Sequence, residues 1–142
     1  MGIFNYYLIR GNMTKNFEIY KCSVCGNVIE VSHCGEGTLT CCEMPMSLLD
    51  GKTTDGATEK HLPVVEIKDN KAFVTVGEVI HPMEEKHYIS FIEVITPSNK
   101  IIKKKLNPND EPKMHFCIKE KGEYIVREYC NLHGLWKTSI KA

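Results

Sequence analysis

The cysteines constrain this chain most, because five of the seven lie between Cys22 and Cys42 and only Cys117 and Cys130 come later. A chain of 142 residues could form one domain, but so uneven a distribution indicates two units. We find no secretory signal peptide and therefore expect a cytoplasmic protein. In that compartment thiols stay reduced, and clustered cysteines hold metal more often than they form disulfides.

The first cluster begins with a C-x-x-C-G turn at Cys22 and Cys25, in which Gly26 lets backbone N–H groups approach the two sulfurs. Short strands are expected on either side of this turn. Farther along the chain, Cys41 and Cys42 supply two more thiolates, so the cluster predicts a tetrahedral four-sulfur metal site.

Adjacent cysteines depart from the repeated C-x-x-C of zinc ribbons, although a structural zinc knuckle remains an alternative for this site. His33 and Cys34 lie nearby and could compete as ligands. We leave both outside the predicted site.

A second set of ligand types is spread over the rest of the chain. Cys130 and His133 lie three residues apart in a turn, so that a thiolate and an imidazole can face one point. The upstream histidines that could converge on the same point are His61, His81 and His87.

These five side chains are predicted to share one metal. Zinc in structural sites prefers four ligands, whereas four imidazoles and one thiolate suit a square pyramid around iron with one position open. Blue copper is the nearest competitor, but it usually needs a methionine close behind the last histidine, and none follows His133.

The region beyond the first cluster reads as seven short strands with turn signals between them and no convincing helix. The strands are expected at about residues 62–69, 71–76, 87–95, 99–106, 113–118, 123–130 and 135–140. Their regular spacing favours an antiparallel β-sandwich of immunoglobulin type, which would place all five ligand candidates at strand ends or in loops. His115 and Cys117 fall within a strand, where His115 should be structural and Cys117 a buried small hydrophobe.

The expected organisation is therefore a weakly ordered N-terminal extension at residues 1–13, a small metal-binding domain at 14–51 and the sandwich at 58–142. A segment rich in Gly, Thr and Asp, residues 51–57, should connect the two domains. The formal charge is zero and no segment approaches the roughly 18 apolar residues of a membrane helix, so neither nucleic acid nor a membrane is expected as a partner.

Taken together, the motifs resemble those of desulfoferrodoxin, the two-iron superoxide reductase. The resemblance runs in order from about Phe17 to the C-terminus and rests on Cys22-x-x-Cys25, Cys41-Cys42, Glu59-Lys60-His61, the segment from His81 to His87, and Tyr129-Cys130-Asn131-Leu132-His133-Gly134. It implies a desulforedoxin-like domain with an Fe(Cys)4 centre and a catalytic iron with His61, His81, His87 and His133 as equatorial ligands and Cys130 as axial ligand.

The function implied by this resemblance is reduction of superoxide to hydrogen peroxide. It also implies a homodimer supplied with electrons by a rubredoxin-like donor. Lys60 would attract the anion, and Glu59 resembles the family carboxylate that binds the ferric iron once the product has left. A zinc-binding interaction module and a blue-copper-like electron carrier remain the alternatives.

Overall fold

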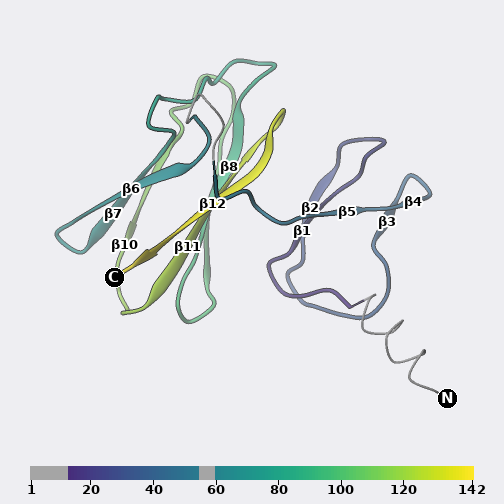
Figure 1. The fold of residues 1–142 in the computed structure, drawn as a ribbon, viewed down its shortest axis with the longest axis horizontal. Helices are drawn as coiled ribbons and strands as arrows, with labels where there is room; N and C mark the ends of the chain where they lie inside the picture. Colours follow the sequence, from purple (N-terminus) through teal and green to yellow (C-terminus); the bar gives the residue numbers. More distant parts are fainter. Residues whose placement is uncertain (1–12, 55–59) are drawn as a thin grey trace. The chain divides into compact units, whose positions relative to one another are not determined.

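The computed structural model describes residues 13–54 and 60–142. The chain divides into two compact units, one up to Asp50 and one from Gly51, and each is described by itself. All regular secondary structure in the described ranges is β-strand (Figure 1). No helix in these ranges is long and apolar enough to cross a membrane. The predicted extension lies largely outside the described residues, apart from Met13, which forms an isolated antiparallel bridge with Glu36.

The first unit is built from five very short strands. Three of them, β1 (Ile19–Lys21), β2 (Val28–Glu30) and β5 (Ser47–Leu49), form an antiparallel sheet in the order β2-β1-β5. The other two, β3 (Thr40–Cys41) and β4 (Met44–Pro45), form a hairpin.

The core of this first unit is small. The buried hydrophobic residues among those described are Ile19, Cys22 and Val31. So few buried side chains cannot offset the conformational entropy of ordering the segment, and small domains of this kind usually depend on a structural metal or disulfides. We therefore expect the first unit to depend on its cysteine cluster for stability.

The second unit contains two antiparallel sheets. One has the order β10-β7-β6, formed by β6 (Pro63–Lys68), β7 (Lys71–Val76) and β10 (Lys113–Cys117). The other has the order β12-β11-β8-β9, formed by β8 (Ile89–Ile95), β9 (Ile101–Lys105), β11 (Glu123–Cys130) and β12 (Gly134–Lys141).

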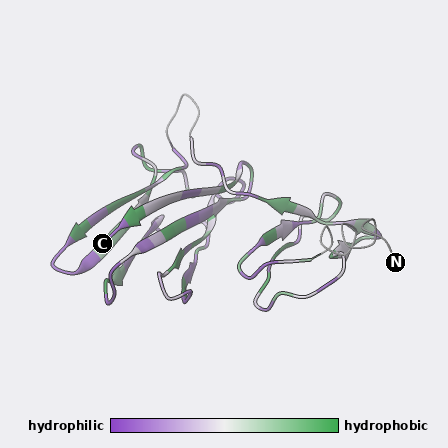
Figure 2. Ribbon diagram, turned by 60° about the horizontal axis from the view of Figure 1, so that its bottom comes forward, coloured by the Kyte–Doolittle hydropathy of each residue, from purple (hydrophilic) through white to green (hydrophobic). Residues whose placement is uncertain are grey.

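Hydrophobic side chains from both sheets fill the space between them. Val74 and Phe116 come from one sheet and Ile92 and Val126 from the other, and all four belong to one buried cluster. Figure 2 shows how hydrophobic and hydrophilic residues alternate along the strands, as expected when one face of a sheet is buried. The predicted all-β architecture of a small unit followed by a seven-stranded sandwich is confirmed.

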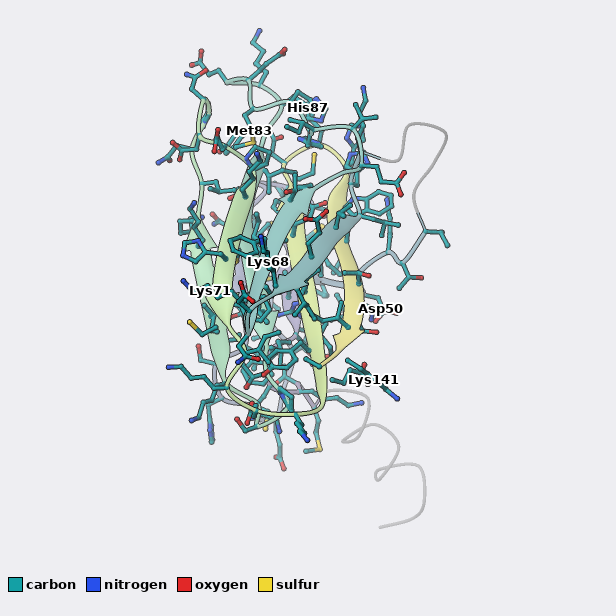
Figure 3. All side chains as sticks on the ribbon, turned by 90° about the vertical axis from the view of Figure 1, so that its left-hand side faces the viewer. Asp50, Lys68, Lys71, Met83, His87 and Lys141 are labelled. Atoms are coloured by element: carbon teal, nitrogen blue, oxygen red, sulfur yellow. The ribbon has the colours of Figure 1, made fainter. Side chains whose placement is uncertain are left out.

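Turn chemistry explains why the predicted strand ends lie close to the observed ones. Asp69 and Asn70 both have positive φ, at 53° and 60°, which is the backbone of a two-residue type I′ hairpin turn and is tolerated best by Asn, Asp and Gly. The turn joins β6 to β7. Figure 3 shows Met83 and His87 at the top of the view, above Lys68 and Lys71, which flank this turn.

The prediction for Cys117 is wrong. Burial alternates along β10, with Met114 and Phe116 facing the core and the residues between them facing outward. Cys117 is the last residue of the strand and falls on the outer face with His115, where it is exposed.

Candidate metal centres

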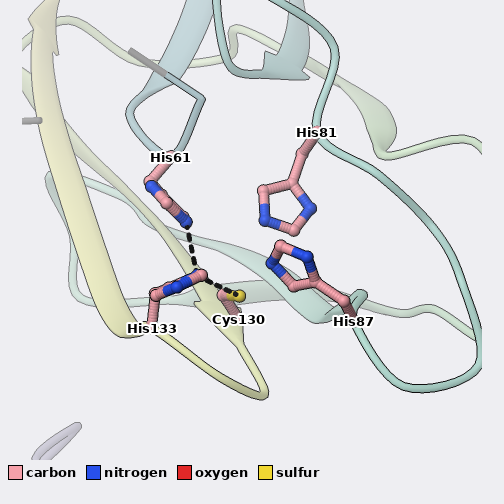
Figure 4. A group of neighbouring side chains, drawn as sticks. All are labelled: His61, His81, His87, Cys130 and His133. Carbon is pink, nitrogen blue, oxygen red and sulfur yellow. Dashed lines mark hydrogen bonds between the residues drawn. The ribbon is translucent and has the colours of Figure 1, made fainter. Parts of the chain in front are cut away.

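The structure brings the five predicted histidine and cysteine ligands together at one end of the sandwich (Figure 4). His61 lies just before β6, His81 and His87 lie in the connection from β7 to β8, Cys130 ends β11, and His133 lies in the turn that leads into β12. Each residue offers one ligand atom, and these atoms all lie within 4.8 Å of one another. The cluster therefore has the dimensions of a single metal site.

The strand ladder is irregular next to Cys130. Tyr129 of β11 pairs with Phe91 of β8, whereas Cys130 pairs with Ile89, so Ser90 is the extra residue on β8 at this shift of register. Such irregularities are common beside functional sites. After His133 the chain enters β12 through Gly134, whose φ of 85° suits glycine.

Asn131 ties the turn before β12 to the loop before β8. Its Oδ1 accepts a hydrogen bond from the Tyr88 N–H at 2.9 Å, and its Nδ2 donates one to the Lys86 carbonyl at 3.0 Å. His87 lies between these two residues, so Asn131 fixes the backbone of one ligand from the loop that carries two others.

Gly77 allows the segment that carries His61 to approach the end of β7. Its N–H donates to the Leu62 carbonyl at 3.0 Å. A Cβ at this position would lie 2.5 Å from the Lys60 carbonyl oxygen and 2.3 Å from that of Val79, so no larger residue fits without a shift of backbone. This close approach places His61 beside the β7–β8 connection.

Hydrogen bonding indicates which ring nitrogen each histidine offers. His81 Nδ1 lies 2.7 Å from the Pro82 carbonyl, which can only accept, so Nδ1 carries the proton and Nε2 is left with its lone pair. His81 Nε2 and His87 Nε2 are buried and have no hydrogen-bond partner among the described residues. His133 Nδ1 lies 3.0 Å from His61 Nε2 and 3.6 Å from the Cys130 sulfur.

Burial keeps two of these imidazoles neutral. The pKa of His81 is lowered to about 4, mainly by burial and to a smaller extent by the charges of His87, His61 and His133, while the hydrogen bond to the Pro82 carbonyl acts in the opposite direction. The pKa of His87 is also lowered, first by burial and then by the charges of His133 and His61. Metals bind the neutral imidazole, so His81 and His87 are ready to act as ligands at neutral pH.

The Cys130 thiol is buried, and this burial raises its pKa. Backbone hydrogen bonds from Leu132 and His133 act in the opposite direction and favour the thiolate. A cation bound among the five donors would displace the thiol proton. Buried Nε2 atoms without partners, a thiol that needs a cation to ionise and five converging donors together fit a metal ion of mixed nitrogen and sulfur preference, as iron is.

Lys60 and Glu59 are the two predicted site residues that are not metal ligands, and only Lys60 belongs to the residues that the structure describes. Lys60 is half-buried directly before His61, and its positive charge is one of the smaller causes of the lowered pKa of His87. Glu59 lies outside the described residues.

The four predicted cysteines of the first unit also converge. The sulfurs of Cys22, Cys25, Cys41 and Cys42 all lie within 4.8 Å of one another, and those of Cys25 and Cys41 are 3.4 Å apart. The cluster of donors contains neither His33 nor Cys34. Cys34 is exposed, and its N–H donates to the Asn16 side chain at 2.7 Å.

Backbone amides stabilise a thiolate in this first cluster. The N–H groups of Val24 and Cys25 point at the Cys22 sulfur at 3.4 and 3.5 Å. These bonds, that of Cys25 first, lower the pKa of Cys22 to about 6, whereas hydrogen bonding to Cys25 and Cys41 raises the pKa of Cys42 to about 12. Cys22 therefore loses its proton most easily and Cys42 keeps its proton, and a cation bound among the four sulfurs would displace the remaining thiol protons.

A hairpin turn explains how two adjacent cysteines can face one metal. Cys42 and Glu43 have φ values of 52° and 61° and form the two-residue turn between β3 and β4. Cys41 thus points from the end of a strand and Cys42 from the turn itself.

Comparison with known proteins relates both units of the chain to one family. The model described as "Desulfoferrodoxin, N-terminal domain" matches residues 14–49, and the model described as "Desulfoferrodoxin" matches residues 53–139. The desulfoferrodoxin homolog of Archaeoglobus fulgidus is 51% identical over 89% of this chain and 99% of its own length. The desulfoferrodoxin of Nitratidesulfovibrio vulgaris is 53% identical over 88% and 98%. The crystal structure of the superoxide reductase from Treponema pallidum matches with a TM-score of 0.66 and 26% identity, covering 88% of this chain and 99% of that one.

Proposed function

Because this chain belongs to the desulfoferrodoxin family, we propose that it is a superoxide reductase that converts superoxide to hydrogen peroxide. The reaction consumes one external electron and two protons for each superoxide and evolves no oxygen. The observation that carries the proposal is the five-donor cluster, which combines four imidazoles and one thiolate at one end of the sandwich.

Each cluster would hold one iron. Cys22, Cys25, Cys41 and Cys42 would bind the first, and His61, His81, His87, His133 and Cys130 the second. Ferrous iron held by the second cluster would supply the electron that superoxide takes up, and five protein donors would leave room for an exogenous ligand.

The surrounding residues would guide the anion and hold the centre in place. The Lys60 ammonium attracts superoxide toward the cluster, Glu59 supplies a carboxylate for the ferric state, and water or a buffer acid provides the protons. The Cys130 thiolate would donate electron density to a bound iron. Asn131 and Gly77 hold the loops that carry the imidazoles.

We further propose that the protein works in the cytoplasm as a homodimer and receives electrons from a small rubredoxin-like protein. The support for these three statements is the family relationship.

The two alternatives account for less of the structure. A zinc-binding interaction module leaves the five-donor cluster without a role. A blue copper carrier would need an axial methionine, but the nearby Met83 sulfur accepts the Ile89 N–H at 3.3 Å and Met83 packs against the hydrophobic core.

The test is metal analysis combined with product stoichiometry. Protein produced with adequate iron and purified without oxygen should contain two irons per chain. When reduced protein reacts with superoxide, each superoxide should give one hydrogen peroxide and no oxygen, whereas dismutation gives half as much peroxide together with oxygen. Stoichiometric zinc, or peroxide and oxygen in the dismutation ratio, would exclude the proposal.

A further inference from the structure

We propose that Lys52 is a positioning residue of the histidine–cysteine centre, acting through Trp136 and the main-chain carbonyl of His133. The inference rests on the proposed function only in taking the five-donor cluster to be a metal centre. Lys52 falls in the segment that the sequence marks as a connection between domains, where a lysine would ordinarily be a solvated surface charge.

The main chain of Lys52 is attached to the sandwich. Its N–H donates to the Leu135 carbonyl at 2.9 Å, and its own carbonyl accepts the Lys137 N–H at 2.8 Å. The two bonds form a parallel bridge between Lys52 and Trp136. Lys52 is therefore held at a fixed position on β12 although it belongs to no strand.

The side chain of Lys52 reaches the turn that carries His133. Its Nζ donates to the His133 carbonyl at 3.3 Å and lies 4.9 Å from the centre of the Trp136 ring, within the range of a cation–π contact. Trp136 Nε1 donates to the same carbonyl at 3.2 Å. One carbonyl thus accepts hydrogen bonds from two side chains.

Trp136 links the same assembly to a second ligand. Its ring is 6% exposed and stacks on the His61 imidazole, with centroids 4.6 Å apart and an interplanar angle of 13°. Lys52 and Trp136 therefore contact two of the five donors, His61 by ring stacking and His133 through its main chain.

The position of the His133 main chain matters because His133 faces the donor cluster with Nδ1. Nδ1 is the ring nitrogen nearer the backbone, and it is the one that lies 3.0 Å from His61 Nε2 and 3.6 Å from the Cys130 sulfur. A small rotation of the His133 peptide would displace Nδ1 directly. His133 is exposed, so packing alone holds it weakly and its carbonyl hydrogen bonds carry more of the restraint.

The variants must separate this role from packing and from simple charge. Lys52→Met keeps the main-chain bridge and an unbranched stem against Trp136 but removes the hydrogen bond and the charge. Lys52→Arg restores both. Lys137→Met is the matched control. Lys137 is hydrogen-bonded to Lys52 through its main chain, but the Lys137 side chain lies along Gly51. The variant therefore removes one positive charge from the same region without removing the hydrogen bond to the His133 carbonyl.

The experiment measures the ferrous dissociation constant of the second centre and the energy of its ferric thiolate charge-transfer band. We expect Lys52→Met to weaken iron binding at that centre about three- to tenfold, the scale of an exposed hydrogen bond that supports a ligand, and to shift the band. Lys52→Arg and Lys137→Met should match the wild-type protein. The four-cysteine centre should keep its spectrum in every variant, which reports that the first unit is intact, and Trp136 fluorescence should report that the second unit of the Lys52 and Lys137 variants is folded.

A second variant tests the shared carbonyl. Trp136→Phe keeps an aromatic ring beside His61 but removes the Nε1 donor. Combined with Lys52→Met, its effect on iron affinity should be non-additive, because both residues restrain the same group.

The inference is overturned if Lys52→Met has wild-type affinity and band energy, if Lys52→Arg fails to restore them, or if Lys137→Met changes them equally. None of these measurements uses superoxide. A protein that binds iron as described but does not reduce superoxide would refute the proposed function and leave the role of Lys52 intact.

Discussion

At the scale of single residues, three of the histidine ligands have a second contact that orients them. His81 is fixed by the Pro82 carbonyl, His61 by stacking on Trp136, and the His87 backbone by Asn131. Such outer partners set the tautomer and direction of a ligand, so changes to them should alter the centre without removing a donor atom. Lys60 differs, because its expected role is to act on the substrate.

Replacing Lys60 with Ala should slow the reaction with superoxide without loss of iron. An ammonium about 6 Å from the anion contributes about 0.7 kcal/mol at the dielectric constant of water and about 2.8 kcal/mol at an effective value of 20. Superoxide must reach the site from solvent, so we expect a value between these limits and a rate about tenfold lower. Pulse radiolysis at several ionic strengths measures the rate constant for the reaction with superoxide. The wild-type rate constant should fall more steeply with added salt than that of the variant.

Lys60→Arg is the control, since it keeps the charge and should retain most of the rate. Equal rate constants and equal salt slopes for wild type and Lys60→Ala would show that Lys60 is an ordinary surface charge.

At the scale of elements, the centre depends on loops being held to one another. Asn131 joins the turn between β11 and β12 to the β7–β8 connection, and Gly77 joins that connection to the segment before β6. The four-stranded sheet beneath has its own constraint, a fully buried Glu93 on β8 that pairs with Arg127 on β11 and lies 3.6 Å from the Lys103 ammonium on β9.

Asn131→Ala should destabilise the metal-free second unit by about 1–3 kcal/mol, because the Tyr88 N–H and the Lys86 carbonyl lose their side-chain partner. Urea unfolding followed by tryptophan fluorescence measures this unit alone, since Trp136 is the single tryptophan of the chain. Asn131→Asp should fall between wild type and Ala, because it can still accept from Tyr88 but cannot donate to Lys86. Unchanged stability of Asn131→Ala would show that water replaces both bonds without cost.

Glu93→Ala should destabilise the same unit by about 3 kcal/mol or more, because it leaves the guanidinium of Arg127 largely buried opposite a cavity. Replacing both Glu93 and Arg127 with Met should lower the free energy of unfolding much less, because folding then no longer has to transfer two charged groups from water into the protein. The same fluorescence-detected unfolding checks both variants. If the double variant were as unstable as Glu93→Ala, packing rather than the lost charge would be the cause.

At the scale of the whole molecule, the chain carries two centres of different chemistry in two units. The first has four sulfur donors and no further ligand position in a tetrahedron, whereas the second has five donors and one position left. The two centres should therefore respond separately to loss of a ligand.

Cys22→Ser should remove the visible colour of the first centre and leave reduction of superoxide largely intact. Cys130→Ser should abolish turnover and leave that colour in place, because it removes the thiolate of the second centre only. Visible spectra of the oxidised proteins and pulse radiolysis of the reduced ones measure both effects. Loss of superoxide reduction in Cys22→Ser with a fully loaded second centre would mean that the roles of the two irons were assigned wrongly.

The sequence by itself determined the strands and the donor residues. Each is encoded locally: alternation of apolar residues and turn pairs such as Asp69-Asn70 define strands within a few residues, and spacings such as Cys22-x-x-Cys25 mark sulfurs that can face one point. Only residue types that bind metal can form such clusters, so few candidates had to be considered.

The tertiary structure alone decided which other residues support the donors. Lys52 lies 81 positions from His133, and Asn131 lies 45 positions from Lys86, and no periodicity or spacing relates residues so far apart. The exposure of Cys117 was decided in the same way, by which face of β10 turned toward the second sheet. Ligand identity follows from side-chain chemistry, whereas the supporting contacts follow from how the strands and loops pack.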